Sequence, residues 1–167
     1  MKQTLTLAEL KKMYACEPAR DVFVKTFGFQ ASIGDIVQRL HAIDATDWEA
    51  WLLARNVELT KSLLKHGADV HAANEWALYL AAAGGRLDVV KLLLKHGADV
   101  HAEDDEALRY AGENGHLDVV KLLLKNGADV HAVSEGGMRD MRDMGYEKIV
   151  RLLEKHMVKA KAKAKRA

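Results

Sequence analysis

A block of ten residues recurs along this chain at intervals of 30 residues. LLKHGADVHA ends at Ala72 and again at Ala102, and LLKNGADVHA ends at Ala132. A fixed period of this kind is the sequence signature of proteins built from one small unit that is stacked repeatedly. In such arrays each unit contacts only its neighbours and buries its apolar surface against them. The chain is therefore expected to form a solenoid.

The segment from Asp88 to Lys95, DVVKLLLK, is typical of a helix that is buried on most of its surface. Asp88, Lys91 and Lys95 are spaced at i, i+3 and i+7 and form one narrow polar stripe, while valine and leucine cover the rest. Such a helix must pack against a partner helix of its own unit and against equivalent helices of adjacent units. Gly97, which follows it, suits the left-handed turn at the end of a helix.

A shorter helix with many small residues is expected before each of these apolar helices. ALYLAAAGG covers residues 77–85, and ALRYAGENG covers residues 107–115. Small side chains let helices approach to about 8–10 Å, so the repeated alanines are interpreted as contacts between adjacent units. These alanines stand at positions 77, 81, 107 and 111, and the final glycine of each segment closes the turn between the paired helices.

Together these patterns resemble the ankyrin repeat, a family of stacked helix-loop-helix units. The resemblance rests on AL-x-x-A, G-H-L-D-V-V-K-L-L-L and G-A-D-V, extends from Asp47 to His131, and implies an all-α solenoid. The period of 30 is shorter than the roughly 33 residues usual in the family. Ala77-Leu78-Tyr79 and Ala107-Leu108-Arg109 stand where P-L-H is usual. We therefore expect short loops with reduced hairpins, as in the ankyrin units of large DNA viruses and some bacteria.

The chain is expected to divide into three parts. Residues 1–43 would form an N-terminal helical cap with a degenerate first repeat, residues 44–156 the ankyrin repeats with a C-terminal capping repeat, and residues 157–167 a basic tail. In the last repeat Glu154 replaces the leucine found in register at positions 64, 94 and 124. A charge at this position implies that no further unit covers it.

The N-terminal part contains three predicted helix starts. Thr6 and Ser32 each precede an acidic residue by three positions, as in a capping box, and Pro18 suits the first turn of a helix. A further capping box at Thr46 predicts the helix that carries Trp48 and Trp51. These starts are expected to supply the cap and the first helix of the array.

The composition of the chain indicates the cellular compartment in which it is expected. Cys16 is the single cysteine, so it cannot form an intrachain disulfide, and the N-terminal residues lack the apolar run of a secretory signal. No stretch reaches the roughly 20 consecutive apolar residues of a membrane helix. We expect no membrane contact and a cytoplasmic protein, or a nuclear one if the basic tail is a localisation signal.

Charge is distributed unevenly along the chain. Residues 155–167 contain five lysines and one arginine without any acidic residue, although the net charge of the whole chain is +1. The first 154 residues therefore carry a charge of about −5, which disfavours nucleic-acid binding on the folded body. The tail is interpreted as a solubilising segment, and the alternative is weak contact with nucleic acid or another anionic surface.

No residue pattern indicates catalysis, a metal or a cofactor. Histidines recur at His71, His101 and His131, but equivalent residues of stacked helices lie about 10 Å apart, whereas nitrogen ligands lie about 2.1 Å from a shared zinc ion. The histidines are therefore assigned structural, hydrogen-bonding roles. Cys16 could be a nucleophile only beside a base, and His41, the nearest candidate, belongs to a separate cap helix. We expect a protein that is not an enzyme.

The tryptophans are expected to serve different purposes. Trp51 occupies the register of Ala81 and Ala111, where a bulky indole suits a wedge between the cap and the first full repeat. Trp76 precedes the first helix of the next unit, and two interpretations remain open for it. One is packing, and the other is an anchor for a bound partner.

Positions that differ between units are the candidates for binding, because stacking positions repeat whereas solvent-facing positions are free to differ. In ankyrin proteins such loop and first-helix positions line the concave face, so the resemblance implies a partner-binding role for them. Aromatic residues and arginine there would supply interface energy, and an acidic rim would favour a basic partner protein. We expect a monomer that binds, and thereby sequesters or inhibits, that protein. The candidate residues are Asn74, Glu75, Trp76, Tyr79, Asp104, Asp105, Glu106, Arg109, Tyr110, Glu113 and Asn114.

Overall fold

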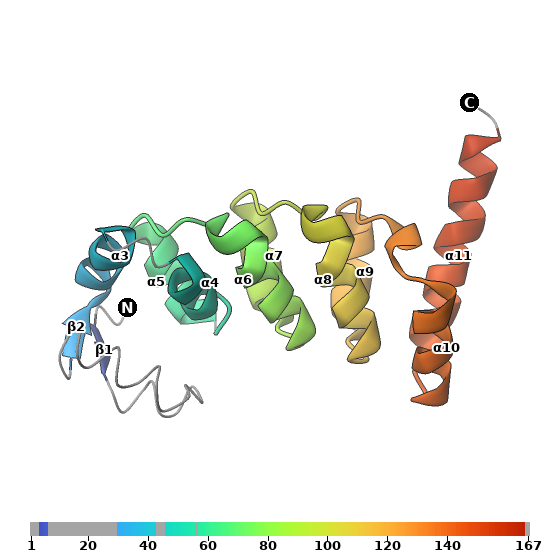
Figure 1. The fold of residues 1–167 in the computed structure, drawn as a ribbon, viewed down its shortest axis with the longest axis horizontal. Coiled ribbons are helices and arrows are strands. Elements are labelled where there is room, and N and C mark those ends of the chain that lie inside the picture. The colour runs from blue at the N-terminus through green and yellow to red at the C-terminus, as the bar shows by residue number, and fades with distance from the viewer. Residues whose placement is uncertain (1–3, 7–29, 43–45, 56, 166–167) are drawn as a thin grey trace.

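The computed structural model describes residues 4–6, 30–42, 46–55 and 57–165 of the chain. Helix pairs follow one another along an elongated array that ends at the C-terminal helix (Figure 1). The prediction of an all-α repeat solenoid is confirmed. A short antiparallel pair, β1 (Thr4–Thr6) and β2 (Gln30–Ser32), adds a minor element that the sequence patterns did not predict.

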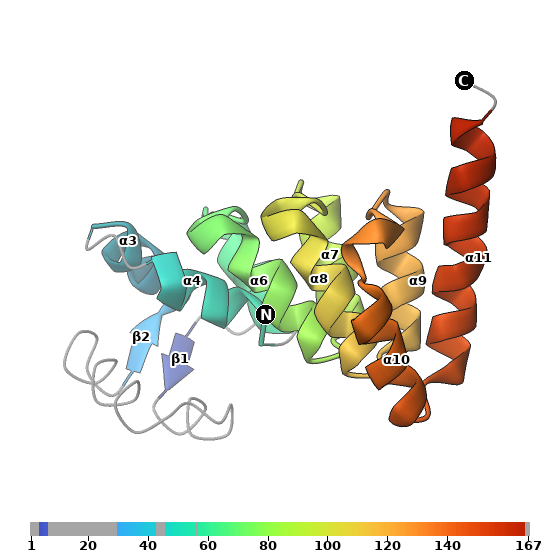
Figure 2. The ribbon, with the colours of Figure 1, turned by 45° about the vertical axis from the view of Figure 1, so that its right-hand side comes forward.

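The helices form two layers, because each unit contributes a first and a second helix (Figure 2). The first helices pack in sequence against one another, as do the second helices behind them. An additional helix, α3 (Ile33–Ala42), packs against the first helix pair at the N-terminal end. The first helices are α4 (Thr46–Leu53), α6 (Ala72–Ala83), α8 (Ala102–Glu113) and α10 (Glu135–Asp143). The second helices are α5 (Val57–Lys65), α7 (Leu87–Lys95), α9 (Leu117–Lys125) and α11 (Glu147–Ala164).

The core repeats with the units. One leucine of each second helix is fully buried, at positions 63, 93, 123 and 153. The alanines predicted as contacts are buried as well, with Ala77, Ala81 and Ala111 at 0% exposure and Ala107 at 5%. Bulk at these alanine positions would separate the first helices, which explains why the same small residue recurs there.

The turn after each second helix follows from the repeated GADVH sequence. Gly67, Gly97 and Gly127 have φ of 89°, 97° and 102°, the left-handed conformation predicted for the helix end. The aspartate two residues later accepts a hydrogen bond from the backbone N–H of the following histidine at 2.9 Å in all three copies. The aspartate is therefore part of the scaffold.

The loops before α6 and α8 are short, and no hairpin projects from them. Residues 73–75 and 103–105, at the beginnings of α6 and α8, all adopt left-handed backbone conformations, with φ between 50° and 64°. The chain before α10 differs, because η1 (Val130–Ala132) is followed by Ser134, whose hydroxyl accepts a hydrogen bond from the Gly137 N–H at 3.1 Å. Both α6 and α8 thus begin with a compact left-handed turn, whereas α10 does not.

At the N-terminal end, the helix start predicted at Ser32 is confirmed. Ser32 Oγ accepts a hydrogen bond from the Asp35 N–H at 3.0 Å at the beginning of α3. Thr6 ends β1, and the helices expected after Thr6 and at Pro18 fall on residues outside the described part of the chain. Cys16 lies outside it as well, so its expected role is not addressed by the structure.

At the C-terminal end, α11 continues without interruption past the predicted start of the basic tail at residue 157. Glu154 is exposed and forms an ion pair with Arg142 at 2.6 Å, so its charge is accommodated at the open end of the array. No helix in the described ranges is both long and apolar enough to cross a membrane.

Trp51 packs against the core from α4, and its side chain is partly buried. The guanidinium carbon of Arg55 lies 4.4 Å from its ring centroid. A packing role for Trp51 agrees with these contacts, and the wedge between the cap and the first full repeat stays a prediction. Trp48 lies on the same helix, but its side chain is outside the described part of the structure.

Candidate functional site

A cluster of aromatic and arginine side chains bridges the first helices α6 and α8. The rings of Tyr79 and Tyr110 meet edge to face, with centroids 4.9 Å apart and an interplanar angle of 77°. The guanidinium carbon of Arg109 lies 4.4 Å from the Tyr110 ring centroid, and Arg109 Nη2 donates to Glu106 Oε1 at 2.8 Å. We call Tyr79, Arg109 and Tyr110 the aromatic cluster. The sequence predicted all three as partner-binding residues, and the structure brings them together.

Burial and nearby charges affect the phenol of Tyr79. Its pKa is raised, first because partial burial disfavours the charged phenolate and then because Tyr110 and Glu106 lie close. The hydroxyl is therefore a neutral hydrogen-bond donor at physiological pH.

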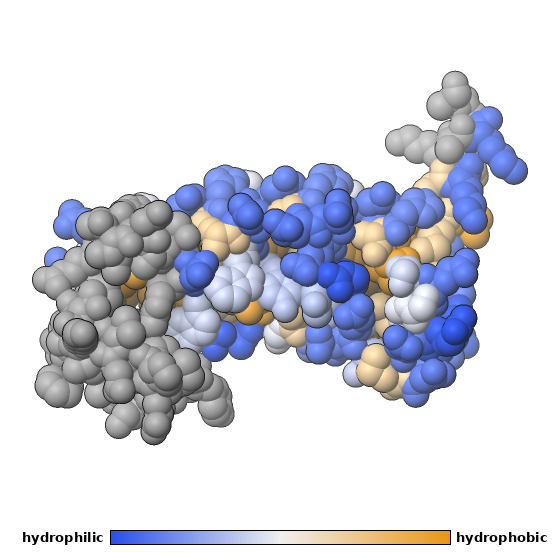
Figure 3. All heavy atoms as spheres, viewed as in Figure 1, coloured by the Kyte–Doolittle hydropathy of each residue, from blue (hydrophilic) through white to orange (hydrophobic). Residues whose placement is uncertain are grey.

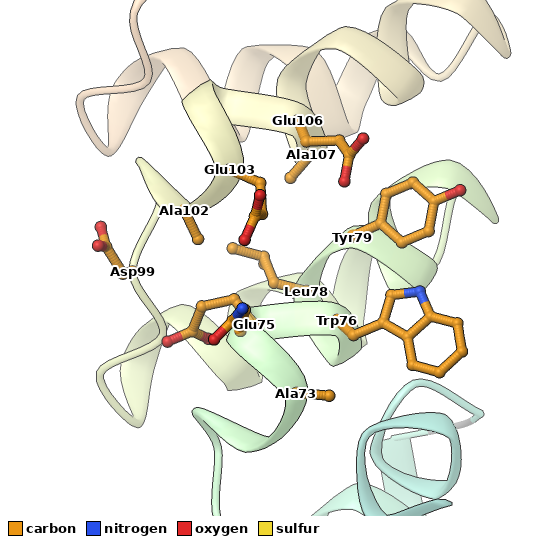
Figure 4. A pocket seen from close by; sticks show the side chains of 11 residues that line it. Ala73, Glu75, Trp76, Leu78, Tyr79, Asp99, Ala102, Glu103, Glu106 and Ala107 are labelled. Atoms are coloured by element: carbon orange, nitrogen blue, oxygen red, sulfur yellow. The ribbon is translucent and has the colours of Figure 1, made fainter. Parts of the chain in front are cut away.

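An acidic groove adjoins the aromatic cluster, between α6 and α8. It has a volume of about 210 Å³ and contains the carboxylates of Glu75, Asp99, Glu103 and Glu106. Trp76 and Tyr79 project along one side of the groove with Glu106 near Tyr79, whereas Asp99 and Glu75 lie on the opposite side (Figure 4). The same face of the molecule shows residues of intermediate hydropathy over the middle of the array, with hydrophilic residues along the loop edge (Figure 3).

Two of the predicted binding residues are buried and belong to the scaffold. Glu75 and Asp105 are each only 5% exposed. Asp105 accepts a hydrogen bond from the Asp129 N–H at 2.9 Å, and Glu75 forms an ion pair with His71. Their carboxylates were expected at the surface because they precede the first helix. The left-handed turns direct them inward instead, so they do not form an exposed acidic rim.

The other predicted residues lie at or near this face but do not form one pocket. Asn74, Trp76, Tyr79 and Glu106 line the acidic groove together with Glu75. Trp76 is 37% exposed, so its indole is not enclosed by the core. The predicted residues that do not line the groove are Asp104, Asp105, Arg109, Tyr110, Glu113 and Asn114.

Sequence reasoning missed two groove carboxylates, Asp99 and Glu103. Asp99 belongs to the repeated GADVH sequence and was therefore treated as scaffold. Glu103 offered a signal, because its register positions in the other units hold Ala73 and Val133. The same comparison between units that selected its neighbours would have found it.

The family of the chain follows from comparison with known proteins. A family model described as ankyrin repeats (3 copies) matches residues 48–134, more than half of the chain. The chain is an ankyrin-repeat protein. A search of curated proteins found no match. The family match ends before α10 and α11, the part interpreted from sequence as a capping repeat.

Ankyrin repeats are protein–protein interaction modules. Three histidines of this array make hydrogen bonds to its backbone carbonyls. His66 and His156 donate through Nδ1 to backbone carbonyls one turn earlier, at 2.8 and 2.9 Å. His116 Nε2 donates to the Ala83 carbonyl at 2.9 Å and so joins adjacent ankyrin units. Within the described ranges, no group of three or more potential ligands could hold a metal ion.

His71 is electrostatically coupled to Glu75 at the beginning of α6. Its pKa is raised, chiefly by its hydrogen bond to Glu75 and then by the charge of that carboxylate. His101 makes the equivalent contact with Asp105 at 3.2 Å. Both pairs join the loop to the beginning of the first helix. They hold the ankyrin loops from which the acidic groove is built.

Proposed function

We propose that this ankyrin array binds a partner protein through the face formed by the loops before α6 and α8 and by these two helices. The aromatic cluster carries the proposal. Tyrosine and arginine are enriched among residues that dominate interface energies, and here three of them are contiguous and partly exposed on one face. A neighbouring exposed tryptophan, Trp76, extends the same surface.

The charge of this face favours a partner with a basic surface. Asp104 and Glu103 are exposed at its edge, and Glu106 is partly exposed. Acidic residues at a rim accelerate association with a positively charged partner and disfavour acidic ones. We propose that binding occurs in the cytoplasm by the monomeric protein, without catalysis, and sequesters or inhibits the partner.

Affinity capture from an extract of the source cells tests the proposal. The wild-type protein is compared with the variant Tyr79→Ala/Arg109→Ala/Tyr110→Ala, and circular dichroism verifies that both fold. A matched control, Lys91→Ala/Lys121→Ala, changes exposed residues of the second helices on the other layer. We expect one protein to be captured by wild type and control but not by the triple variant. Equal capture by all three proteins would reject this face as the binding surface.

A second candidate function is association with nucleic acid through the lysine-rich end of α11. This end projects beyond the other helices (Figure 1), and Lys155, Lys159, Lys161 and Lys165 are exposed on it. Closely spaced lysines attract phosphates in a salt-dependent manner. Removing residues 157–167 would abolish salt-sensitive binding of nucleic acid if this function is real, whereas partner capture would persist.

A further inference from the structure

The acidic groove between α6 and α8 has an excess of negative charge. Of its carboxylates, Glu106 is paired with Arg109 and Glu75 with His71. Glu103 and Asp99 form no ion pair with any residue that the structure describes. Asp99 uses one oxygen to accept the backbone N–H of His101. No described lining residue is lysine or arginine, so the groove presents negative charge that the described residues do not neutralise.

Glu75 adds a buried carboxylate oxygen to the negative charge of the groove. Glu75 Oε1 is bonded to His71, but its Oε2 is buried and has no hydrogen-bond partner within the described part of the chain. An unpaired buried acceptor is costly, and the cost falls when a hydrogen-bond donor or a positive charge comes near. Glu75 lines the groove, so a cationic ligand in the groove would lie near this uncompensated acceptor and lower its cost.

The size of the groove limits what can occupy it. Its volume of about 210 Å³ is below the roughly 300–1,000 Å³ of sites that enclose a whole small-molecule ligand or cofactor. One side chain of a partner protein is a suitable occupant. The aromatic side chains of Trp76 and Tyr79 on one side would contact its apolar part or its cationic group (Figure 4).

Two arginines of this chain show which cation suits a site made of aromatic rings and carboxylates. Arg109 and Arg55 each place a guanidinium carbon 4.4 Å from an aromatic ring centroid, and Arg109 simultaneously pairs with the Glu106 carboxylate. A guanidinium can stack on a ring and bond a carboxylate in its own plane, which a lysine ammonium cannot do. Building on the proposed function, we propose that the acidic groove receives an arginine side chain of the partner protein, with Glu103 as its ion-pair partner and Trp76 as its aromatic contact.

The next junction along the array does not repeat this chemistry. Between α8 and α10, Val133 and Gly136 hold the positions of Glu103 and Glu106, and Arg109 holds that of Tyr79. Two acidic side chains are thus missing there and a cation replaces an aromatic ring. Of these two junctions, only the one between α6 and α8 has the residues of the arginine site. The partner would therefore bind at a defined position along the array.

Binding of a small arginine probe tests the proposal on the full chain. Nα-acetyl-L-arginine amide is titrated into the ¹⁵N-labelled protein, and the shift of the Trp76 indole N–H resonance is followed. The citrulline analogue has nearly the same shape without the charge, and the lysine analogue has the charge without the planar group. We expect saturable shifts with arginine, weaker ones with lysine and none with citrulline.

Two neighbouring substitutions separate the groove from general surface charge. Glu103→Gln removes a groove carboxylate, whereas Asp104→Asn removes an exposed one from the same turn that does not line the groove. We expect Glu103→Gln to weaken arginine binding about fivefold, the effect of roughly 1 kcal/mol, and Asp104→Asn to weaken it less than about twofold. Equal effects of the two substitutions, or equal shifts with citrulline, would overturn the proposal.

The probe experiment tests the arginine site and the capture experiment tests the binding face, so either proposal can be rejected without the other. If a partner is captured through the aromatic cluster but arginine amide does not bind, the arginine site is wrong and the binding face stands. If arginine amide binds the groove but no partner depends on the aromatic cluster, the site stands and the proposed binding face is wrong.

Discussion

Glu103 combines a strained backbone conformation with a negative charge. With Asp104 and Asp105 it occupies a left-handed turn, and its φ is 50°. A side chain in this conformation clashes with its own backbone at a cost of about 1–2 kcal/mol, which glycine avoids. Three successive residues share this cost in each of two loops. Interactions such as the bond from the Asp129 N–H to Asp105 offset it.

Relief of this strain can be measured. We expect Glu103→Gly to raise the free energy of unfolding by about 0.5–1 kcal/mol, because the relief exceeds the entropy cost of glycine. The control Lys121→Gly, at an exposed position inside α9, should lower it by about 1 kcal/mol. Denaturant midpoints report both changes. A loss of stability in Glu103→Gly would show that the turn is not strained.

A second residue-scale prediction concerns pH. His71 has a raised pKa in the folded chain because of Glu75, so protonated His71 stabilises the fold. This stabilisation is fully present below the unfolded pKa, about 6.5, and is lost as pH rises through the higher folded pKa. Wild type should therefore lose thermal stability relative to His71→Asn as pH rises from about 6 to 8.

His131→Asn is the matched control for this pH effect. His131 stands in the same register, but the structure shows no ion pair between it and Glu135, the counterpart of Glu75. His131→Asn therefore shows the effect of removing a histidine from this register without breaking such an ion pair. Parallel pH profiles for wild type and His71→Asn would contradict the assigned role of the His71–Glu75 pair.

At the scale of elements, the turns between paired helices set how closely adjacent units approach. A Cβ on Gly115 would lie 2.6 Å from Cε1 of Tyr146 in the next unit, and one on Gly85 would lie 2.5 Å from Nδ1 of His116. Gly97 also has positive φ, but a Cβ there would meet no atom within 4 Å. Gly97 thus serves backbone conformation alone, whereas Gly85 and Gly115 also leave room for the next unit.

The two requirements can be separated by alanine substitution. We expect Gly97→Ala to lower the free energy of unfolding by about 1–2 kcal/mol, the cost of alanine in a left-handed conformation. Gly115→Ala should lower it by a further 1–3 kcal/mol or so, because the new methyl group displaces Tyr146. Urea unfolding measures both. Equal losses would mean that the ring moves aside without cost.

At the scale of the whole molecule, the array has few units and its ends influence its stability. In a stacked array each unit is stabilised by its own contacts and by those with its neighbours. The N-terminal unit contains Trp51, whose partly buried side chain packs against the core. Weakening this unit should open the array from one end before the central units respond.

Trp51→Ala tests this behaviour. We expect a loss of about 2 kcal/mol, less than the roughly 3–5 kcal/mol for a fully buried tryptophan. Hydrogen exchange should accelerate in α4 and α5 more than in α9. Val158→Ala, at a position that is 67% exposed, should change neither quantity appreciably. Uniform acceleration along the chain would indicate that the array unfolds as one cooperative unit.

The repeat in the sequence was sufficient to determine the architecture. Equivalent residues recur every 30 positions, so a single unit explains the buried leucines and left-handed glycines of the repeated copies and the contact alanines of α6 and α8. The same comparison identified Tyr79, Arg109 and Tyr110 as surface residues. These features follow from local conformation and periodic burial, which a sequence encodes directly.

Only the tertiary structure decided how the acidic residues at the beginnings of α6 and α8 are used. Their sequence is polar and suggests a solvated loop, but two left-handed turns bury Glu75 and Asp105 and leave Glu103 and Asp104 exposed. The direction of each side chain depends on backbone conformation and on groups supplied by the next unit, such as the Asp129 N–H. The acidic groove arises in the same way, because α6 and α8 each contribute part of it.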